Sequence, residues 1–140
     1  MDSDSLSERM LACAYKVSNR LGAGFVEKVY ENALAHELGK AGIPYEQQKE
    51  IRVTYDRVVV GRFICDFLVQ DRILLELKAV KGLDELHFAQ GLNFLKATGL
   101  PVCLLLNFGT PKLEIRRLVP GRHWDGTEKK KEPVMNGDER

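Results

Sequence analysis

Three charged side chains, Asp66, Glu76 and Lys78, lie inside two hydrophobic segments of strand length within "CDFLVQDRILLELKAV", residues 65–80. Burying an unpaired charge is costly, so these residues need partners or a chemical role. Side chains alternate along a strand, which places Glu76 and Lys78 on one face and the leucines beside them on the other. The pattern therefore predicts a polar patch on a buried sheet.

The connection between the two segments decides whether Asp66 joins that patch. Directly opposed residues of an antiparallel pair share a face of the sheet. A connection with an even number of residues would oppose Asp66 to Leu75, whereas an odd connection or one β-bulge opposes it to Glu76. We therefore expect an odd loop or a bulge near residues 70–72.

With that register, two carboxylates and an ammonium group converge. Close carboxylates repel each other, and one tends to take up a proton unless a cation is present. Mg²⁺ or Mn²⁺ suits such a site, because both prefer carboxylate, carbonyl and water oxygens, and the carbonyl of Leu77 adds one more oxygen. Lys78 could then orient a water or stabilise charge on a phosphate. The alternative is a buried ion pair of Lys78 with either carboxylate that only fixes strand register.

Length and composition are typical of one globular domain: 140 residues, 44% hydrophobic and 29% charged. The formal net charge of +1 provides no global basic field, although a local basic patch stays open. The chain has no apolar run long enough for a membrane helix and no secretory signal, so we expect a cytoplasmic protein without membrane association. Cys13, Cys65 and Cys103 are far apart and predict reduced core thiols, not disulfides or a zinc site.

The hydrophobic periodicity predicts eight elements in the order α-α-β-β-β-α-β-β, an α/β fold in which helices flank a mixed sheet. Residues 1–119 form the predicted domain, and the polar residues 120–140 are expected to be a mostly disordered tail. The last strand is expected at a sheet edge. The predicted helices cover residues 5–20, 25–40 and 83–98, and the predicted strands cover residues 47–55, 58–69, 72–80, 101–108 and 112–119.

Other segments carry a resemblance to a known family. "GFVEKVY" has the spacing G-x-x-E-x-x-Y, and "HFAQGLNFLKATGLP" and "LLLNFG" follow the third predicted strand. Together with "CDFLVQDRILLELKAV", these segments closely resemble the small bacterial proteins of the GxxExxY family, which is placed in the PD-(D/E)XK nuclease superfamily. The resemblance covers roughly residues 6–119, and its motifs occur in the expected order.

This resemblance implies a restriction-endonuclease-like core that holds a metal-dependent phosphodiesterase site. Asp66 matches the superfamily's aspartate, and Glu76 and Lys78 match its E-x-K motif. Glu27 matches an acidic residue on the first core helix that often completes the metal site. Gln90 matches the glutamine of the Q-x-x-x-Y pattern found in RecB-type nucleases. The metal ligands that the resemblance implies are Glu27, Asp66 and Glu76, and the carbonyl of Leu77 joins them from the strand geometry given above.

Two positions depart from the superfamily pattern, and two more leave a role open. Cys65 stands where the motif has proline, and Phe94 stands where the RecB-type pattern has tyrosine, which removes a hydroxyl group. Tyr30 reads as a core aromatic or as a substrate contact. His87 shares a helical stripe with Gln90 and reads as structural or as a phosphate contact.

The leading hypothesis is a Mg²⁺- or Mn²⁺-dependent nuclease with DNA favoured over RNA. A domain of this size has little room for base readout, so we expect any selectivity to concern ends, flaps, branches or junctions. A homodimer would pair two sites on a two-stranded substrate. The alternatives are a non-catalytic nucleic-acid-binding or complex-assembly module that keeps the nuclease fold, and an enzyme acting on another phosphodiester or small ligand.

Overall fold

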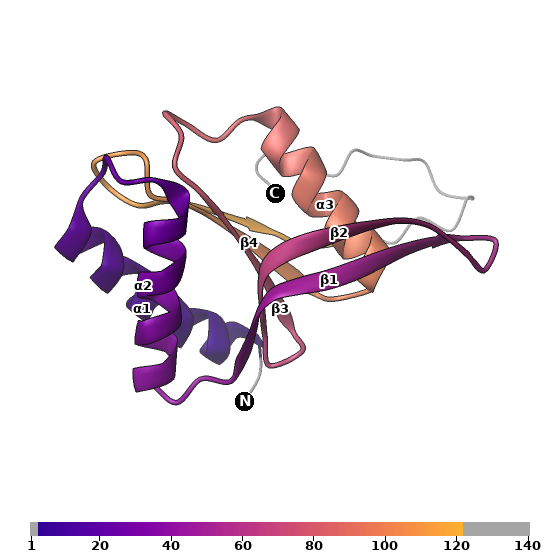
Figure 1. Ribbon diagram of the computed structural model, residues 1–140, viewed down its shortest axis with the longest axis horizontal. Helices are drawn as coiled ribbons and strands as arrows, with labels where there is room; N and C mark the ends of the chain where they lie inside the picture. Colours follow the sequence, from indigo (N-terminus) through magenta and orange to yellow (C-terminus); the bar gives the residue numbers. More distant parts are fainter. Residues whose placement is uncertain (1–2, 122–140) are drawn as a thin grey trace.

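The computed structural model describes residues 3–121, and its elements follow the predicted order (Figure 1). Within that range no helix is both long enough and apolar enough to cross a bilayer. The predicted tail, apart from its first two residues, lies outside the described residues. The helices are α1 (Ser3–Leu21), α2 (Glu27–Lys40) and α3 (Glu85–Thr98), and the strands are β1 (Tyr45–Tyr55), β2 (Val58–Val69), β3 (Ile73–Lys78), β4 (Val102–Asn107) and β5 (Glu114–Leu118).

The five strands form one mixed sheet in the order β1-β2-β3-β4-β5. Neighbouring strands are antiparallel except β3 and β4, which are parallel because α3 returns the chain to the start of β4. β4 is buried along its whole length, and β5 lies at an edge as predicted. The predicted α/β class and mixed sheet are therefore confirmed.

Two hydrophobic cores lie on the two faces of this sheet. The first core packs α1 and α2 against one face, and the second core packs α3 against the other (Figure 1). In β3, Leu75 and Leu77 belong to the first core and Leu74 belongs to the second. This alternation places Glu76 and Lys78 on the face of the second core, as the sequence predicted.

β2 contributes to both cores, and the phase of its side-chain alternation changes once along the strand. Phe63 and Cys65 pack in the second core, whereas Phe67 and Val69 pack in the first. Residues spaced by two along a regular strand would all share one face. The strand therefore changes face between Cys65 and Phe67, and the residue at the change is Asp66.

The neighbouring strand is irregular at the same level. Gln48 of β1 is opposite Asp66 but forms no ladder pair with it, and its φ of 56° lies in the left-handed region. A non-glycine residue held there costs roughly 1–3 kcal/mol. The irregularity inserts no residue, because the pairs on either side, Gln47 with Phe67 and Lys49 with Cys65, keep one register.

Candidate active site

The connection between β2 and β3 has three residues. Val69 pairs with Ile73, so residues 70–72 form the turn, and the odd connection predicted from the sequence is confirmed. The ladder continues to Phe67 opposite Leu75 and then stops. From that level β2 pairs only with β1, and β3 pairs only with β4.

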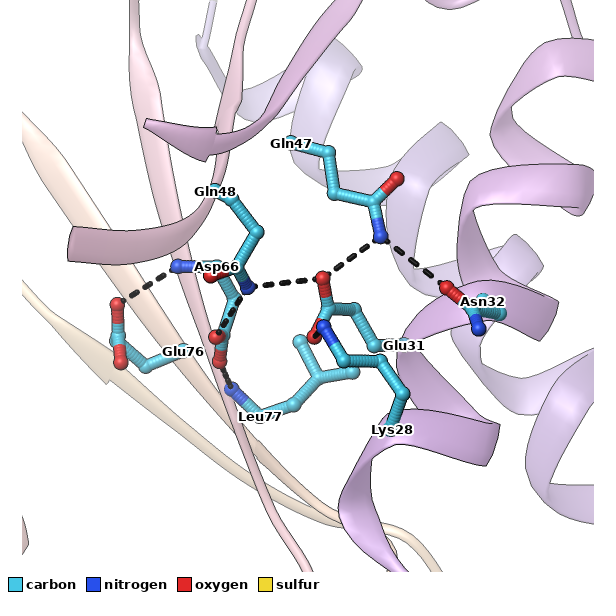
Figure 2. Close-up of polar contacts among 8 residues, drawn as sticks. All are labelled: Lys28, Glu31, Asn32, Gln47, Gln48, Asp66, Glu76 and Leu77. Atoms are coloured by element: carbon cyan, nitrogen blue, oxygen red, sulfur yellow. Dashed lines mark hydrogen bonds and ion pairs between the residues drawn. The ribbon is translucent and has the colours of Figure 1, made fainter. Parts of the chain in front are cut away.

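Side chains take over the backbone pairing where this ladder ends (Figure 2). The backbone N–H of Asp66 donates to Oε2 of Glu76 at 3.1 Å. The backbone N–H of Leu77 donates to Oδ2 of Asp66 at 2.8 Å. Each carboxylate thus binds the backbone of the opposite strand through one oxygen. The arrangement brings Asp66 and Glu76 together, as the predicted register required.

Burial sets the protonation state of these carboxylates. Glu76 is 8% exposed, and burial, followed by repulsion from Asp66, raises its pKa from 4.5 to about 8. The Asp66 N–H and the Lys78 ammonium oppose that shift. Burial also raises the pKa of Asp66, against the opposing hydrogen bond from Leu77. Without a cation, Glu76 therefore holds a proton near neutral pH.

Lys78 and Glu27 approach the pair from different elements. Lys78 is half-buried at the end of β3, and its charge favours the ionised forms of Glu27, Asp66 and Glu76. Glu27 is the first residue of α2 and is exposed as a whole, but its carboxyl group is partly desolvated. That desolvation, followed by the charge of Asp66, raises its pKa. The carboxyl group of Glu27 therefore lies within electrostatic range of the Asp66 carboxylate.

The G-x-x-E-x-x-Y motif shapes the turn that presents Glu27. Gly24 has a φ of 119°, which side-chain-bearing residues rarely adopt. Tyr30 is fully buried; its hydroxyl accepts the N–H of Phe25 at 3.1 Å and donates to the carbonyl of Gly22. Tyr30 is therefore the core aromatic with a satisfied hydroxyl, one of the two readings of the sequence.

Phe108 connects this turn to the end of β4. Its ring stacks on Tyr30 with centroids 4.8 Å apart, and the preceding residue, Asn107, is fully buried. The Asn107 amide donates to the Val80 carbonyl and to Glu114, and its oxygen accepts the N–H groups of Val80 and Gly109. These bonds fix the backbone of the segment that follows Lys78. The G-x-x-E-x-x-Y motif therefore positions Glu27, and the "LLLNFG" segment positions Lys78.

Sequence reasoning missed a second polar cluster beside the site (Figure 2). Glu31 of α2 is 5% exposed and accepts hydrogen bonds from Gln47 at 2.7 Å and Gln48 at 2.9 Å, and it pairs with Lys28 at 3.0 Å. Burial favours the neutral acid, but the bonds from Gln47, Lys28 and Gln48 outweigh it and hold its pKa below the usual value. The available signal was the spacing of Glu31, one helical turn after Glu27.

α3 carries the remaining candidates, Gln90 and His87, and the position Phe94. Gln90 is exposed, and its role at the site stays a prediction from the RecB-type pattern. His87 is structural: its Nδ1 accepts the N–H of Asp84, and its own N–H binds the Asp84 carboxylate, which caps α3. Phe94 is buried and stacks on Phe63 at 4.0 Å, so an apolar ring fits its position.

The donor set fits a hard divalent cation. Among residues 3–121, no three His, Cys, Asp or Glu side chains lie in an arrangement that could already hold a metal ion, and Glu27 as a ligand stays a prediction. Mg²⁺ is often held by one or two carboxylates together with waters. Asp66 and Glu76 each commit one oxygen to the opposite strand. A cation would also relieve the repulsion that raises the pKa of Glu76.

Comparison with known proteins identifies the class. The sequence model of the PD-(D/E)XK nuclease superfamily matches residues 4–118, and the chain belongs to this superfamily. The narrower GxxExxY family stays a prediction. A search of curated proteins found no match.

Two solved structures align with this chain. An alkaline exonuclease from Laribacter hongkongensis, LHK-Exo, aligns with a TM-score of 0.51 and 15% identity over 80% of this chain and 69% of its own. SSO0001 aligns with a TM-score of 0.49 and 15% identity over 67% of this chain, which spans half the length of SSO0001. The first of these supports the assignment of the fold.

Proposed function

We propose that the protein is a Mg²⁺- or Mn²⁺-dependent nuclease that hydrolyses phosphodiester bonds, with DNA favoured over RNA. The observation that carries this proposal is the meeting of Asp66 and Glu76 where β2 and β3 separate, with Lys78 two residues further along. Membership of the nuclease superfamily supports the class of reaction.

The residues of the site have separate roles in this proposal. Asp66 and Glu76 would hold the cation, and the carbonyl of Leu77 and the carboxylate of Glu27 on α2 would complete its ligands. A bound divalent cation supplies Lewis-acid activation of water and neutralises charge on the phosphate. Lys78 orients the water or stabilises the negative charge that develops on the phosphoryl oxygens. Gln90 belongs to the site only through its match to the RecB-type pattern.

The substrate proposal follows from size and charge. A small domain with a net charge of +1 has little surface for reading bases, which favours recognition of ends, flaps, branches or junctions. A homodimer would present two sites to a two-stranded substrate, and sedimentation velocity tests it. Cys13, Cys65 and Cys103 are free and buried, which fits the reducing cytoplasm that we propose as the location.

A cleavage assay tests the proposed activity. Labelled DNA and RNA single strands, duplexes, flaps and four-way junctions are incubated with Mg²⁺, Mn²⁺ or EDTA. Asp66→Asn and Glu76→Gln keep a hydrogen-bond acceptor at each position while removing the charge. Glu50→Gln alters an exposed carboxylate of β1 and serves as the matched control. Metal-dependent products that both site variants lack and the control retains are the expected result.

The opposite result would favour the non-catalytic module. A folded protein that binds Mn²⁺ but cleaves no substrate in the panel would contradict the nuclease assignment. In that case nucleic-acid binding should be equally strong with Mn²⁺ and with EDTA. Cleavage that persists in Glu76→Gln would also contradict it, because the site residues would then be dispensable.

A further inference from the structure

The backbone of β1 is irregular beside the candidate site. Gln48 has a φ of 56° although it is neither a glycine nor in a turn. Consecutive side chains of a strand normally point to opposite faces. Here the side-chain amides of Gln47 and Gln48 both reach Glu31 on α2 (Figure 2). The left-handed conformation therefore turns Gln48 toward the helix.

The Gln48 amide lies between two carboxylates. Its nitrogen is 2.9 Å from Oε2 of Glu31 and 3.4 Å from Oδ1 of Asp66. An amide nitrogen carries two hydrogens, so one group can donate to both acceptors, and two acceptors fix which end of the amide is nitrogen. The amide thus bridges a helix carboxylate to the strand carboxylate of the candidate site.

The helix end of this bridge is firmly held. Glu31 is buried and also accepts from Gln47 and pairs with Lys28. Glu27 lies one turn earlier on the same side of α2, because residues four apart are neighbours on a helix surface. The bridge consequently connects the helix that carries Glu27 to the strand that carries Asp66.

We propose that Gln48 is a positioning residue: its amide holds Asp66 at a fixed distance from α2 and so places Glu27 relative to Asp66 and Glu76. This inference rests on the proposed function, since it treats those carboxylates as two halves of one cation site. It also explains why an unfavourable backbone conformation persists at this point. Such conformations are retained where surrounding contacts determine them, and they cluster at functional sites.

Gln48→Gly separates positioning from folding, because it removes the side-chain amide and also removes the cost of the left-handed backbone conformation at this position. Gln70→Gly is the matched control: Gln70 has a φ of 50° and lies in the turn between β2 and β3. In EDTA, the Tm of Gln48→Gly should equal or exceed that of wild type, as should that of the control. Calorimetry should show Mn²⁺ affinity reduced by about tenfold in Gln48→Gly alone, the size expected for a group that orients a ligand. Wild-type affinity in Gln48→Gly would overturn the proposal.

A double-mutant cycle tests the link to Glu27. Glu27→Gln is made in wild type and in Gln48→Gly, and the Mn²⁺ affinities of all four proteins are compared. If Gln48 places Glu27, the loss caused by Glu27→Gln should be clearly smaller when the amide is already absent. Losses that are independent of each other would overturn the positioning role.

A second readout needs no metal. The Leu77 N–H is held by Asp66, so its hydrogen exchange in EDTA reports how firmly that carboxylate is fixed. Exchange at Leu77 should be faster in Gln48→Gly than in wild type and Gln70→Gly, and equal rates would contradict the inference. Failure of the wild type to bind Mn²⁺ would refute the proposed function, while the exchange of Leu77 would still decide the positioning role.

Discussion

Replacing Glu76 by glutamine should change the pH dependence of stability in the metal-free protein. The pKa of Glu76 is raised from 4.5 to about 8, so between these values the folded chain keeps a proton that the unfolded chain releases. Stability therefore falls as the pH rises through this window and is greatest below it. Each pKa unit of difference between the folded and unfolded chain corresponds to about 1.4 kcal/mol. The full loss in the free energy of unfolding is therefore of order 5 kcal/mol.

Urea denaturation in EDTA, from about pH 5 to about pH 8.5, measures this loss. Glu76→Gln should match wild type at the acidic end and should exceed its stability by up to about 5 kcal/mol at the alkaline end. The glutamine oxygen still accepts the N–H of Asp66, while the buried charge is absent. Glu50→Gln should keep the wild-type profile because Glu50 is exposed.

Three results would count against this reasoning. If the free energy of unfolding of the wild type did not change with pH over this window, ionising Glu76 would carry no cost in the folded state. A variant that keeps the wild-type slope would assign the slope to another group. A variant that is destabilised at alkaline pH would favour the buried ion pair with Lys78 over a cation site.

Three other predictions concern the cation, the lysine and a close backbone contact. Calorimetry near pH 7 in buffers of different ionisation enthalpy should show about one proton released per Mn²⁺ bound. Binding without proton release would count against Glu76 as a ligand. In the same assay, Asp66→Asn should weaken Mn²⁺ binding by at least about tenfold. Lys78→Met should lower kcat by about 10²–10³-fold and change the Kd for Mn²⁺ by less than about threefold, and unchanged turnover would remove its catalytic role. Gly109→Ala should destabilise the fold by about 3 kcal/mol or more in urea titrations, because an added Cβ would lie 2.3 Å from the Val80 carbonyl oxygen. A Cβ added at Gly39 meets nothing within 4 Å, so Gly39→Ala should stabilise the fold by about 0.5–1 kcal/mol. Similar changes in stability for the two variants would disprove the steric argument.

The sequence carried enough information to predict the order of the elements and the meeting of Asp66 with Glu76. The order follows from hydrophobic periodicity, and the meeting follows from an odd number of residues between β2 and β3. Both are local properties of the sequence. The cluster around Glu31 could not be predicted in the same way. A period-two pattern assumes that consecutive residues alternate, and nothing in "EQQKE" marks Gln48 as left-handed. Glu31 also resembles an ordinary surface charge until β1 is packed against α2.

The change of face in β2 also limits how this chain can diverge. Phe63 and Cys65 pack in the second core, whereas Phe67 and Val69 pack in the first and Leu68 packs in the second, so the side-chain alternation has opposite phase on the two sides of Asp66. A gain or loss of one residue between Cys65 and Phe67 would invert the side chains of the strand on one side of Asp66. Point substitution is therefore tolerated far more readily than length variation at this position. Among homologues, gaps in β2 should occur near the β1–β2 turn and not beside the aspartate.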